Sequence, residues 1–207
     1  MGFGKFITLE GPEGSGKSTQ ARLLAGYITG FGREVVCTRE PGGVSISEQL
    51  REILLDTEST IYPTAELLLY AAGRAQHTQE KIFPALKESK FVICERFTHA
   101  SIAYQGYGRG LDRELIDKLN DIAAGGLKPD LTVILDIDVE TGLKRARDSS
   151  GKLDRLESEN VSFHKKVREG YLELAGENPD IEVVSSLGTR DKIKEGIIEI
   201  LKRRNII

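Results

Sequence analysis

One run of eight residues constrains the fold of this 207-residue chain more than any other feature: Gly11-Pro12-Glu13-Gly14-Ser15-Gly16-Lys17-Ser18. It matches the pattern G-x-x-x-x-G-K-[ST] fully, directly after an expected strand and directly before an expected helix. Glycines let the backbone curl until successive N–H groups point at a polyphosphate, and the following helix adds its positive N-terminal end. The run therefore predicts a binding site for a nucleoside triphosphate.

Two side chains of this run have distinct expected tasks. Lys17 offers a point charge to the β- and γ-phosphates, and the Ser18 hydroxyl offers a ligand to Mg²⁺. We expect the nucleotide to contact the run and the residue that follows it, namely Gly11, Pro12, Glu13, Gly14, Ser15, Gly16, Lys17, Ser18 and Thr19.

Short apolar runs alternate with helical patterns along the rest of the chain. Strands are expected at 6–9, 34–38, 91–94, 131–135 and 181–184, and helices at 18–28, 45–56, 64–87, 112–124, 158–175 and 191–204. Such alternation implies right-handed crossovers and a parallel sheet covered on both faces. The prediction is an α/β protein of the P-loop NTPase class, with a five-stranded parallel sheet, helices on both faces and a short lid. No linker divides the chain, so residues 1–207 are expected to form one domain.

Local patterns refine this outline. Ser45 and Glu48 form an expected capping box at the start of a helix with the apolar stripe Ile46, Leu50, Ile53 and Leu54. Pro84 is expected to disturb the long helix, and Asp112 is expected to cap the next one. The small polar stretch 148–152 lies between two helical patterns, and its composition predicts a mobile flap.

Charge, hydropathy and cysteine content exclude several classes of protein. Hydrophobic residues make up 39% and charged residues 29% of the chain, which is a globular composition, and the net charge is −3. A chain with this balance lacks the basic surface expected for binding nucleic acid or an anionic membrane. Cys37 and Cys94 each lie in an apolar stretch, so buried reduced thiols are expected. Without a signal-peptide pattern or a long apolar run, the protein is expected in the cytoplasm.

Further segments predict a second substrate that is anionic and carries a ring. Arg39 follows the second expected strand and Arg96 follows the third, which places both at the edge where parallel sheets bind ligands. Tyr70 and Arg74 lie four residues apart on one helix and therefore share a face. The segment 104–110 is rich in glycine and carries two tyrosines suited to stacking.

Three classes of protein could use the bound nucleotide: switch GTPases, motor or regulatory ATPases, and small-molecule kinases. The Asn-Lys-x-Asp run with which switch GTPases usually read guanine does not occur in this sequence. Motor ATPases are usually larger than 207 residues. The additional arginines favour the third class, a kinase whose second substrate bears a phosphate.

In this order and spacing the motifs resemble those of a thymidylate kinase of the type common in bacteria. The resemblance covers almost the whole chain and rests on the glycine loop with Glu13 and on the runs Arg39–Gly43, Tyr70–Arg74, Glu95-Arg96 with Ala103–Gly106, and Leu153–Glu157. It implies phosphoryl transfer from ATP to dTMP with Mg²⁺ as cofactor. It also implies a homodimer formed by helices that pack away from the active site.

The resemblance implies roles for individual residues as well. Arg96 and Arg39 would hold the monophosphate of dTMP, while Tyr70 stacks on thymine and Arg74 hydrogen-bonds to its O4. Lys17 and Arg96 would act in catalysis. The remaining expected substrate contacts are Glu13 near the 3′-hydroxyl, Ser101 near thymine N3, Tyr104 at the 2′ position, and Gln105.

The chain departs from the family pattern at two important places. Glu95 stands where the family usually has aspartate, and Ser18 with Glu95 forms the expected Mg²⁺ site. Relatives whose glycine loop lacks an arginine usually carry one in the lid, expected here at about 147–156. This lid offers Arg147 or Lys152 for that catalytic charge, and the sequence does not decide between them.

Two other functions remain open on the sequence. One is another monophosphate kinase, acting on AMP, UMP/CMP or a shikimate-like acid, since one architecture serves all of these. The other is a nucleotide-sensing module without catalytic activity. The dimer surface also remains open, because the apolar stretch Leu67–Leu69 suits an interface as well as a core.

Overall fold

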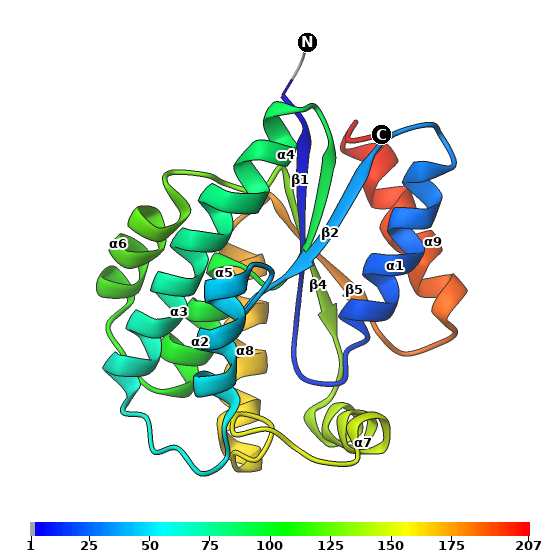
Figure 1. The fold of residues 1–207 in the computed structure, drawn as a ribbon. Coiled ribbons are helices and arrows are strands. Elements are labelled where there is room, and N and C mark those ends of the chain that lie inside the picture. Colours follow the sequence, from blue (N-terminus) through cyan, green and yellow to red (C-terminus); the bar gives the residue numbers. More distant parts are fainter. Residues whose placement is uncertain (1–2) are drawn as a thin grey trace.

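Five parallel strands form one sheet at the centre of the computed structural model, which describes residues 3–207 (Figure 1). The strands are β1 Lys5–Glu10, β2 Val35–Arg39, β3 Phe91–Glu95, β4 Leu131–Asp136 and β5 Ile181–Ser185. Their order across the sheet is β2-β3-β1-β4-β5, and Ile7 of the central strand pairs with Ile93 on one side and Leu131 on the other. The expected parallel sheet is confirmed, and its carboxyl ends meet at one edge.

Helices cover both faces of this sheet (Figure 1). On one face lie α1 (Lys17–Thr29) and α9 (Arg190–Arg203), and the opposite face is covered by several helices including α3 (Pro63–His77) and α8 (Val161–Glu177). The other helical elements are α2 Ser45–Leu55, η1 Thr78–Ile82, α4 Phe83–Lys87, α5 Thr98–Ser101, η2 Ile102–Gly108, α6 Arg113–Ala124 and α7 Val139–Ser150, of which η1 and η2 are π-helical. A helix with the length and apolar character needed to traverse a bilayer does not occur within residues 3–207.

The core lies on both sides of the central strand. Ile7 and Leu9 point toward α1 and α9, where they pack with Leu24 and Ile197. Phe6 points to the opposite face, among side chains of β3, η1 and α4. All five side chains are at most 1% exposed, and burying one of this size stabilises the fold by about 1.5–3 kcal/mol. Burial on two faces explains why β1 is a nearly continuous apolar run.

The α2 helix forms where the sequence predicts it, but two of its predicted details are wrong. Val44 occupies the N-cap position and no side chain caps the helix, so the expected capping box is absent. Glu48 instead accepts a hydrogen bond from the Gly43 amide at 2.7 Å, because it turns toward the loop that precedes the helix. Ile46 and Ile53 are 51% and 48% exposed, so only part of the apolar stripe faces the core.

Two other local predictions are confirmed. The long helical stretch is interrupted by the π-helical turn Thr78–Ile82 immediately before Pro84. Proline lacks an N–H and its ring clashes with the carbonyl four residues earlier, which accounts for a widened turn at this place. Asp112 caps α6, since its Oδ1 accepts a hydrogen bond from the Leu115 amide at 2.9 Å.

The two cysteines differ in their surroundings. Both are free thiols, but Cys37 is exposed, which corrects the expectation that both are buried. It lies on β2, one of the two edge strands of the sheet. Cys94 lies on β3 between two neighbouring strands and is fully buried, and burial raises the pKa of its thiol well above the usual value.

Candidate active site

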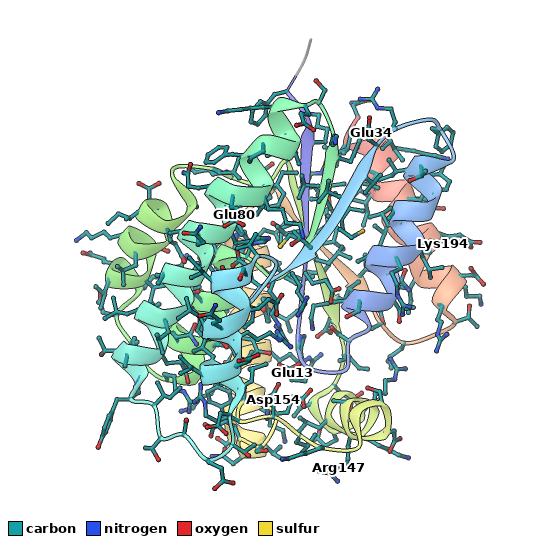
Figure 2. All side chains as sticks on the ribbon, viewed as in Figure 1. Glu13, Glu34, Glu80, Arg147, Asp154 and Lys194 are labelled. Atoms are coloured by element: carbon teal, nitrogen blue, oxygen red, sulfur yellow. The ribbon has the colours of Figure 1, made fainter. Side chains whose placement is uncertain are left out.

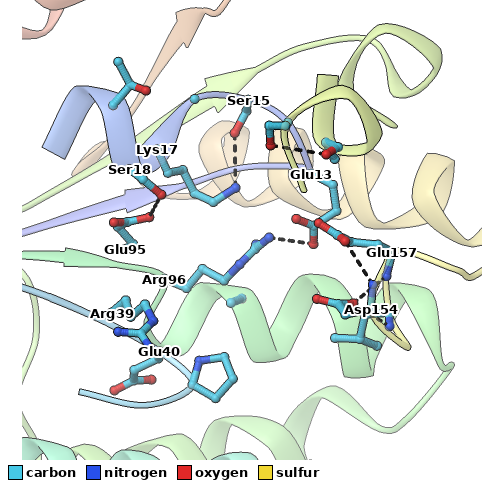
Figure 3. Close-up of a pocket in the computed structure, with 18 of the residues that line it drawn as sticks. Glu13, Ser15, Lys17, Ser18, Arg39, Glu40, Glu95, Arg96, Asp154 and Glu157 are labelled. Carbon is cyan, nitrogen blue, oxygen red and sulfur yellow. Dashed lines mark hydrogen bonds and ion pairs between the residues drawn. The ribbon is translucent and has the colours of Figure 1, made fainter. Parts of the chain in front are cut away.

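One cavity of about 850 Å³ opens at the carboxyl edge of the sheet. Segments that follow each of the five strands line it, so residues far apart in the sequence meet there. Most of the residues singled out in the sequence line it: Glu13, Gly14, Ser15, Gly16, Lys17, Ser18, Thr19, Arg39, Tyr70, Arg74, Glu95, Arg96, Ser101, Tyr104 and Gln105. Figure 3 shows the glycine loop on one side of this cavity and the arginines on the other.

The glycine loop joins the end of β1 to the start of α1. Gly14 has a φ of 65°, and a Cβ on it would lie 1.9 Å from the carbonyl oxygen of Gly142 in α7. Only glycine fits that contact, so the loop packs directly against the helix that precedes the predicted lid. Gly16, also with a positive φ, forms the N-cap of α1 and directs the helix N-terminus into the cavity.

The Lys17 ammonium lies folded across this loop. Its Nζ donates hydrogen bonds to the carbonyl oxygens of Gly11 at 3.0 Å and Pro12 at 2.8 Å, and to Ser15 Oγ at 3.2 Å. Gly11 and Pro12 therefore hold the Lys17 ammonium through their main-chain carbonyl oxygens. Burial, reinforced by the nearby positive charge of Arg96, lowers the pKa of Lys17 to about 8.

A hydroxyl and a carboxylate meet beside the lysine. Ser18 Oγ donates a hydrogen bond to Glu95 Oε2 at 2.5 Å, and the parallel register of β1 with β3 brings Glu95 to this position (Figure 3). Mg²⁺ characteristically binds one or two protein oxygens and completes its shell with water and substrate phosphates. The pair therefore fits Mg²⁺, and no group of three or more His, Cys, Asp or Glu side chains suited to another metal occurs among residues 3–207.

Arg96 lies between the glycine loop and the opposite wall. Its φ of 66° is unusual for a residue with a side chain, and it turns the guanidinium back toward the loop. Nη2 donates to Glu13 Oε1 at 2.7 Å, while Nη1 donates to the Gly11 carbonyl at 3.0 Å and to the Tyr171 hydroxyl at 3.2 Å. Burial would raise the pKa of Glu13, but Arg96 and Lys17 outweigh it and lower that pKa to about 2.

A second layer of buried groups holds Arg96 in place. The Tyr171 hydroxyl donates to Glu10 Oε2 at 2.8 Å, and Glu10 Oε1 accepts from the Phe97 amide at 2.7 Å. Glu10 ends β1 and is fully buried, and this burial raises the pKa of its carboxyl group. Hydrogen bonds at the guanidinium group and at the following amide, that of Phe97, therefore fix the strained backbone of Arg96.

Arg74 is also held rigidly, although it lines the cavity. Its side chain is 1% exposed and forms an ion pair with Glu40, with Nε donating to Oε2 at 2.8 Å. Nη1 donates to Ser101 Oγ at 3.0 Å and to Asn120 Oδ1 at 2.5 Å, and Nη2 donates to the Phe97 carbonyl at 2.8 Å. Four partners on different elements therefore fix the plane of this guanidinium.

The carboxylate that holds Arg74 has a second buried partner. Glu40 Oε1 lies 3.0 Å from His77 Nδ1, and His77 Nε2 lies 2.7 Å from Thr38 Oγ1. His77 is 0% exposed. This chain of contacts connects the loop after β2 to α3 and fixes Glu40 where Arg74 needs it.

The other predicted substrate residues surround these two arginines. Arg39 is half-exposed and its Nη2 donates to Glu48 Oε2 at 2.8 Å, and it reaches the cavity from the last position of β2. The Tyr104 hydroxyl donates to Glu13 Oε1 at 2.7 Å, beside Arg96. Tyr70 lines the same side, and burial raises the pKa of its hydroxyl.

Two predicted lid residues lie apart from this group. Arg147 is exposed on α7 (Figure 2). Lys152 is exposed just beyond that helix, and neither residue lines the cavity. Residues 147–150 complete the helix, and Gly151, with a φ of 68°, follows it as the C-cap. Arg145 on the same helix does line the cavity, and its Nη1 donates to the Ser186 carbonyl at 3.1 Å.

Sequence reasoning missed several residues of this site. Arg145 and Arg190 line the cavity, but in the sequence their charges look like ordinary surface charges. Glu10 and Tyr171 hold Arg96 from behind, and Asn120 holds Arg74. A carboxylate at the end of an otherwise apolar strand is a signal that could have identified Glu10, whereas Tyr171 matches ordinary core spacing.

The chain has a parallel sheet with a glycine loop at its carboxyl edge, and this loop shares a cavity with buried arginines. These features define a P-loop NTPase. Comparison with known proteins narrows this class, since the family model described as Thymidylate kinase matches residues 9–197. The chain belongs to the thymidylate kinase family, and the family resemblance of its sequence motifs is confirmed.

Individual relatives agree with this family. The chain is 57% identical over 183 residues to a thymidylate kinase of Geotalea uraniireducens strain Rf4, which covers 86% of each sequence. It is 51% identical over 212 residues to one of Geobacter sp. strain M21, covering 99% of this chain and 93% of that one. The crystal structure of thymidylate kinase from Ehrlichia chaffeensis superposes with a TM-score of 0.80 at 35% identity, covering 96% of this chain and 99% of the other.

Proposed function

We propose that this chain transfers the terminal phosphoryl group of ATP to dTMP, giving ADP and dTDP. The observation that carries the proposal is the shared cavity, in which a triphosphate-binding loop faces a set of fixed arginines. The bond between the γ-phosphorus and the β,γ-bridging oxygen breaks, and a bond forms to an oxygen of the acceptor phosphate. The family to which the chain belongs supports this activity.

The donor side binds ATP through residues 11–19. Backbone amides and the N-terminus of α1 face the polyphosphate, and Lys17 moves from its contacts on the loop to the β- and γ-phosphates. Ser18 and Glu95 would hold Mg²⁺, Glu95 through water. The ion supplies charge neutralisation at the phosphates. Arg145 and Arg190, which line the cavity beyond the loop, suit the nucleoside end of ATP.

The acceptor side binds dTMP with its phosphate toward Lys17. Arg96 and Arg39 hold the phosphate, for which fork-shaped guanidinium groups are well suited. Tyr70 stacks on thymine, and Arg74 with Ser101 recognises its polar edge. Glu13, Tyr104 and Gln105 surround the deoxyribose.

Catalysis in this site needs positioning and charge rather than a general base. The acceptor phosphate is already an anion, so no proton has to be removed before it attacks. Lys17 and Arg96 stabilise the charge on the group in transit, with Arg147 or Lys152 joining them when the lid segment closes. Closure also excludes water, which would otherwise consume ATP.

A single assay tests this function against its alternatives. The protein is incubated with ATP, Mg²⁺ and each of dTMP, dUMP, dCMP, AMP, UMP and CMP, and ADP formation is measured. We expect dTMP to be the best acceptor. A preference for a ribonucleotide would identify a different monophosphate kinase, and ATP binding without transfer to any acceptor would identify a nucleotide-sensing module.

We also propose a homodimer that forms through α2, α3 and α6. Exposed apolar side chains gather on these helices, which lie together on one side of the molecule (Figure 1): Ile46, Ile53, Leu68, Leu115 and Ile122. Exposed apolar patches mark protein interfaces. The variant Ile53→Asp should sediment as a monomer where the parent sediments as a dimer, and a monomeric parent would contradict the proposal.

We propose that the protein acts in the cytoplasm, because the two free thiols of this chain suit a reducing compartment.

A further inference from the structure

A buried cluster lies behind the acceptor side of the cavity and is not used by the proposed reaction. At its centre is Glu66, in the first turn of α3, whose side chain is 0% exposed. It accepts hydrogen bonds from Gln105 Nε2 at 2.8 Å and from Arg109 Nη2 at 3.1 Å, and it pairs with Arg155 Nη1 at 2.7 Å. One carboxylate therefore holds two guanidinium groups.

The charged groups of this cluster form ion pairs with one another. Burial alone would raise the pKa of Glu66, but hydrogen bonds from Arg109, Gln105 and Arg155 lower it, so the carboxylate stays ionised. Arg109 also reaches Glu159, with Nη1 and Oε1 2.5 Å apart. Arg155 depends on Glu66 for its ion pair and on main-chain atoms for its other contacts.

Those main-chain contacts anchor the segment that follows the predicted lid. Arg155 Nε donates to the Leu54 carbonyl at 2.7 Å, and the Arg155 amide donates to the Leu55 carbonyl at 3.2 Å. Arg155 is thus attached to the end of α2 and to the start of α3 at the same time. It is the point where the chain returns from α7 to the body of the protein.

Residues close in sequence to Arg155 and Glu66 line the cavity on its proposed acceptor side. Asp154 and Glu157 flank Arg155 and line the cavity, and Figure 3 shows both on the side of Glu13. Tyr70, which lines the cavity, follows Glu66 by one turn of α3. The same ion pair therefore fixes a wall beside the acceptor base and the segment in which the lid ends.

Stability alone does not account for this arrangement. Replacing a buried ion pair by well-packed apolar residues is often neutral or stabilising. In addition, Arg155 Nη2 is buried and has no hydrogen-bond partner among residues 3–207, which is unfavourable for a purely structural side chain. What the pair does supply is a fixed location for residues 153–157.

We infer that Glu66 and Arg155 are positioning residues for the acceptor site. They hold residues 153–157 against the cavity, so that productive binding of dTMP depends on the ion pair while ATP binding does not. This inference rests on the proposed function, because it assigns the acceptor to the side lined by Tyr70 and Asp154. Neither residue touches the reacting atoms.

Two conservative variants test the inference by steady-state kinetics. Arg155→Lys keeps the charge but loses the fork that reaches both Glu66 and Leu54, and Glu66→Gln keeps the shape but loses the charge. We expect each to raise KM for dTMP at least about tenfold, with KM for ATP changed less than about twofold, because a misplaced wall of this kind can cost about 100-fold. Arg113→Lys and Asp117→Asn alter an exposed ion pair on α6 and serve as controls that should leave both KM values unchanged.

Amide hydrogen exchange provides a readout that does not depend on the reaction. Exchange should become faster at residues 153–157 in both variants, while residues 11–18 keep the protection of the parent protein. If Glu66→Gln does not fold, Arg155→Lys alone decides. Equal changes in both KM values, or unchanged exchange at 153–157 in a folded Arg155→Lys protein, would overturn the inference. Faster exchange in a protein whose parent does not phosphorylate dTMP would instead reject the proposed function and leave the anchor intact.

Discussion

Arg96 and Glu13 form an ion pair, with 2.7 Å between Nη2 and Oε1, at the point where the two sides of the cavity meet. Glu13 belongs to the glycine loop, the proposed donor side, and Arg96 belongs to the loop after β3, on the proposed acceptor side. With a pKa of about 2, Glu13 is ionised at neutral pH. The arginine is therefore aimed before substrate arrives, which reduces the cost of ordering it during the reaction.

Arg96→Lys should separate charge from geometry at this place. Lysine retains the positive charge but cannot reach Glu13, Gly11 and Tyr171 together, so kcat/KM for dTMP should fall at least about 100-fold. Binding of ATP, measured by calorimetry, should change little. Arg168→Lys is the matched control, because Arg168 also forms an ion pair with a carboxylate, that of Asp136. A loss smaller than fivefold for Arg96→Lys would remove Arg96 from the acceptor site.

Lys17 should give the reaction a basic limit. Because its pKa is lowered to about 8 in the ligand-free protein, it loses its proton as the pH rises through 8, and kcat/KM for ATP should fall about tenfold per pH unit above that value. The ordinary pKa of a lysine is 10.5. Below pH 8 the buried Lys17 is charged, and its burial lowers the free energy of unfolding. This loss of stability disappears as the pH rises from 8 toward 10.5. Lys17→Arg should abolish the basic limit. A parent profile that is flat up to pH 10 would contradict the assignment.

Base recognition by Arg74 and Ser101 should produce unequal discrimination among pyrimidines. Cytosine would leave buried polar groups unpaired, so dCMP should be poorer than dTMP by about 10⁴–10⁵ in kcat/KM. Uracil differs from thymine by one methyl group, so dUMP should be poorer by only about 10–200-fold. The two substrates serve as controls for each other in the same assay. Similar rates with dCMP and dTMP would show that the base is read elsewhere.

The lid cation can be identified by substituting Arg147 and Lys152 one at a time. A catalytic cation in phosphoryl transfer contributes about 10³–10⁵ in rate, so Arg147→Ala or Lys152→Ala should lower kcat at least 100-fold, and the other should not. Arg145→Ala is the comparison within the same helix and should mainly raise KM for ATP. If neither Arg147 nor Lys152 affects kcat, the charge comes from another part of the chain.

The thiols should react in two steps. Cys37 is exposed and should react with a disulfide reagent in the folded protein, whereas Cys94 is 0% exposed and should react only after unfolding in guanidinium chloride. Partial burial of the Cys37 thiol and the nearby charge of Glu95 raise its pKa, and full burial raises that of Cys94, so the measurement is best made at mildly alkaline pH, where more thiolate is present. Cys37→Ser should remove the first step. Two equivalents reacting at once in the folded protein would mean that β3 is not buried.

The fold could be predicted from the sequence because its signals are local and repeated. The apolar run of β1 and the glycine run after it fix a strand, a turn and a helix within a few residues. The exposure of Ile46 on α2 could not be predicted, because it depends on how α2 meets α3. Whether a strand lies at the edge of the sheet is likewise a global property, and for this reason the exposure of Cys37 was not foreseen.

The candidate site was predictable in its lining and not in its support. Arg74 and Arg96 stand out because arginine is unusual next to buried strands and in apolar helices. The groups that hold them, Glu10, Asn120 and Tyr171, come from three other elements. Of these only Glu10 carries a signal in the sequence, as a carboxylate at the end of an apolar strand. Contacts across 46 to 161 residues of sequence are set by tertiary packing, which a periodicity does not encode.

The central position of β1 has a consequence for how the protein is made. This strand ends at Glu10, whereas the two strands that flank it begin at Phe91 and Leu131. At a synthesis rate of about 5–20 residues per second, roughly 4–24 s pass between the emergence of β1 and that of its neighbours. Until β3 emerges during translation, this apolar segment therefore has both hydrogen-bonding edges unpaired, which favours aggregation of the nascent chain at that stage.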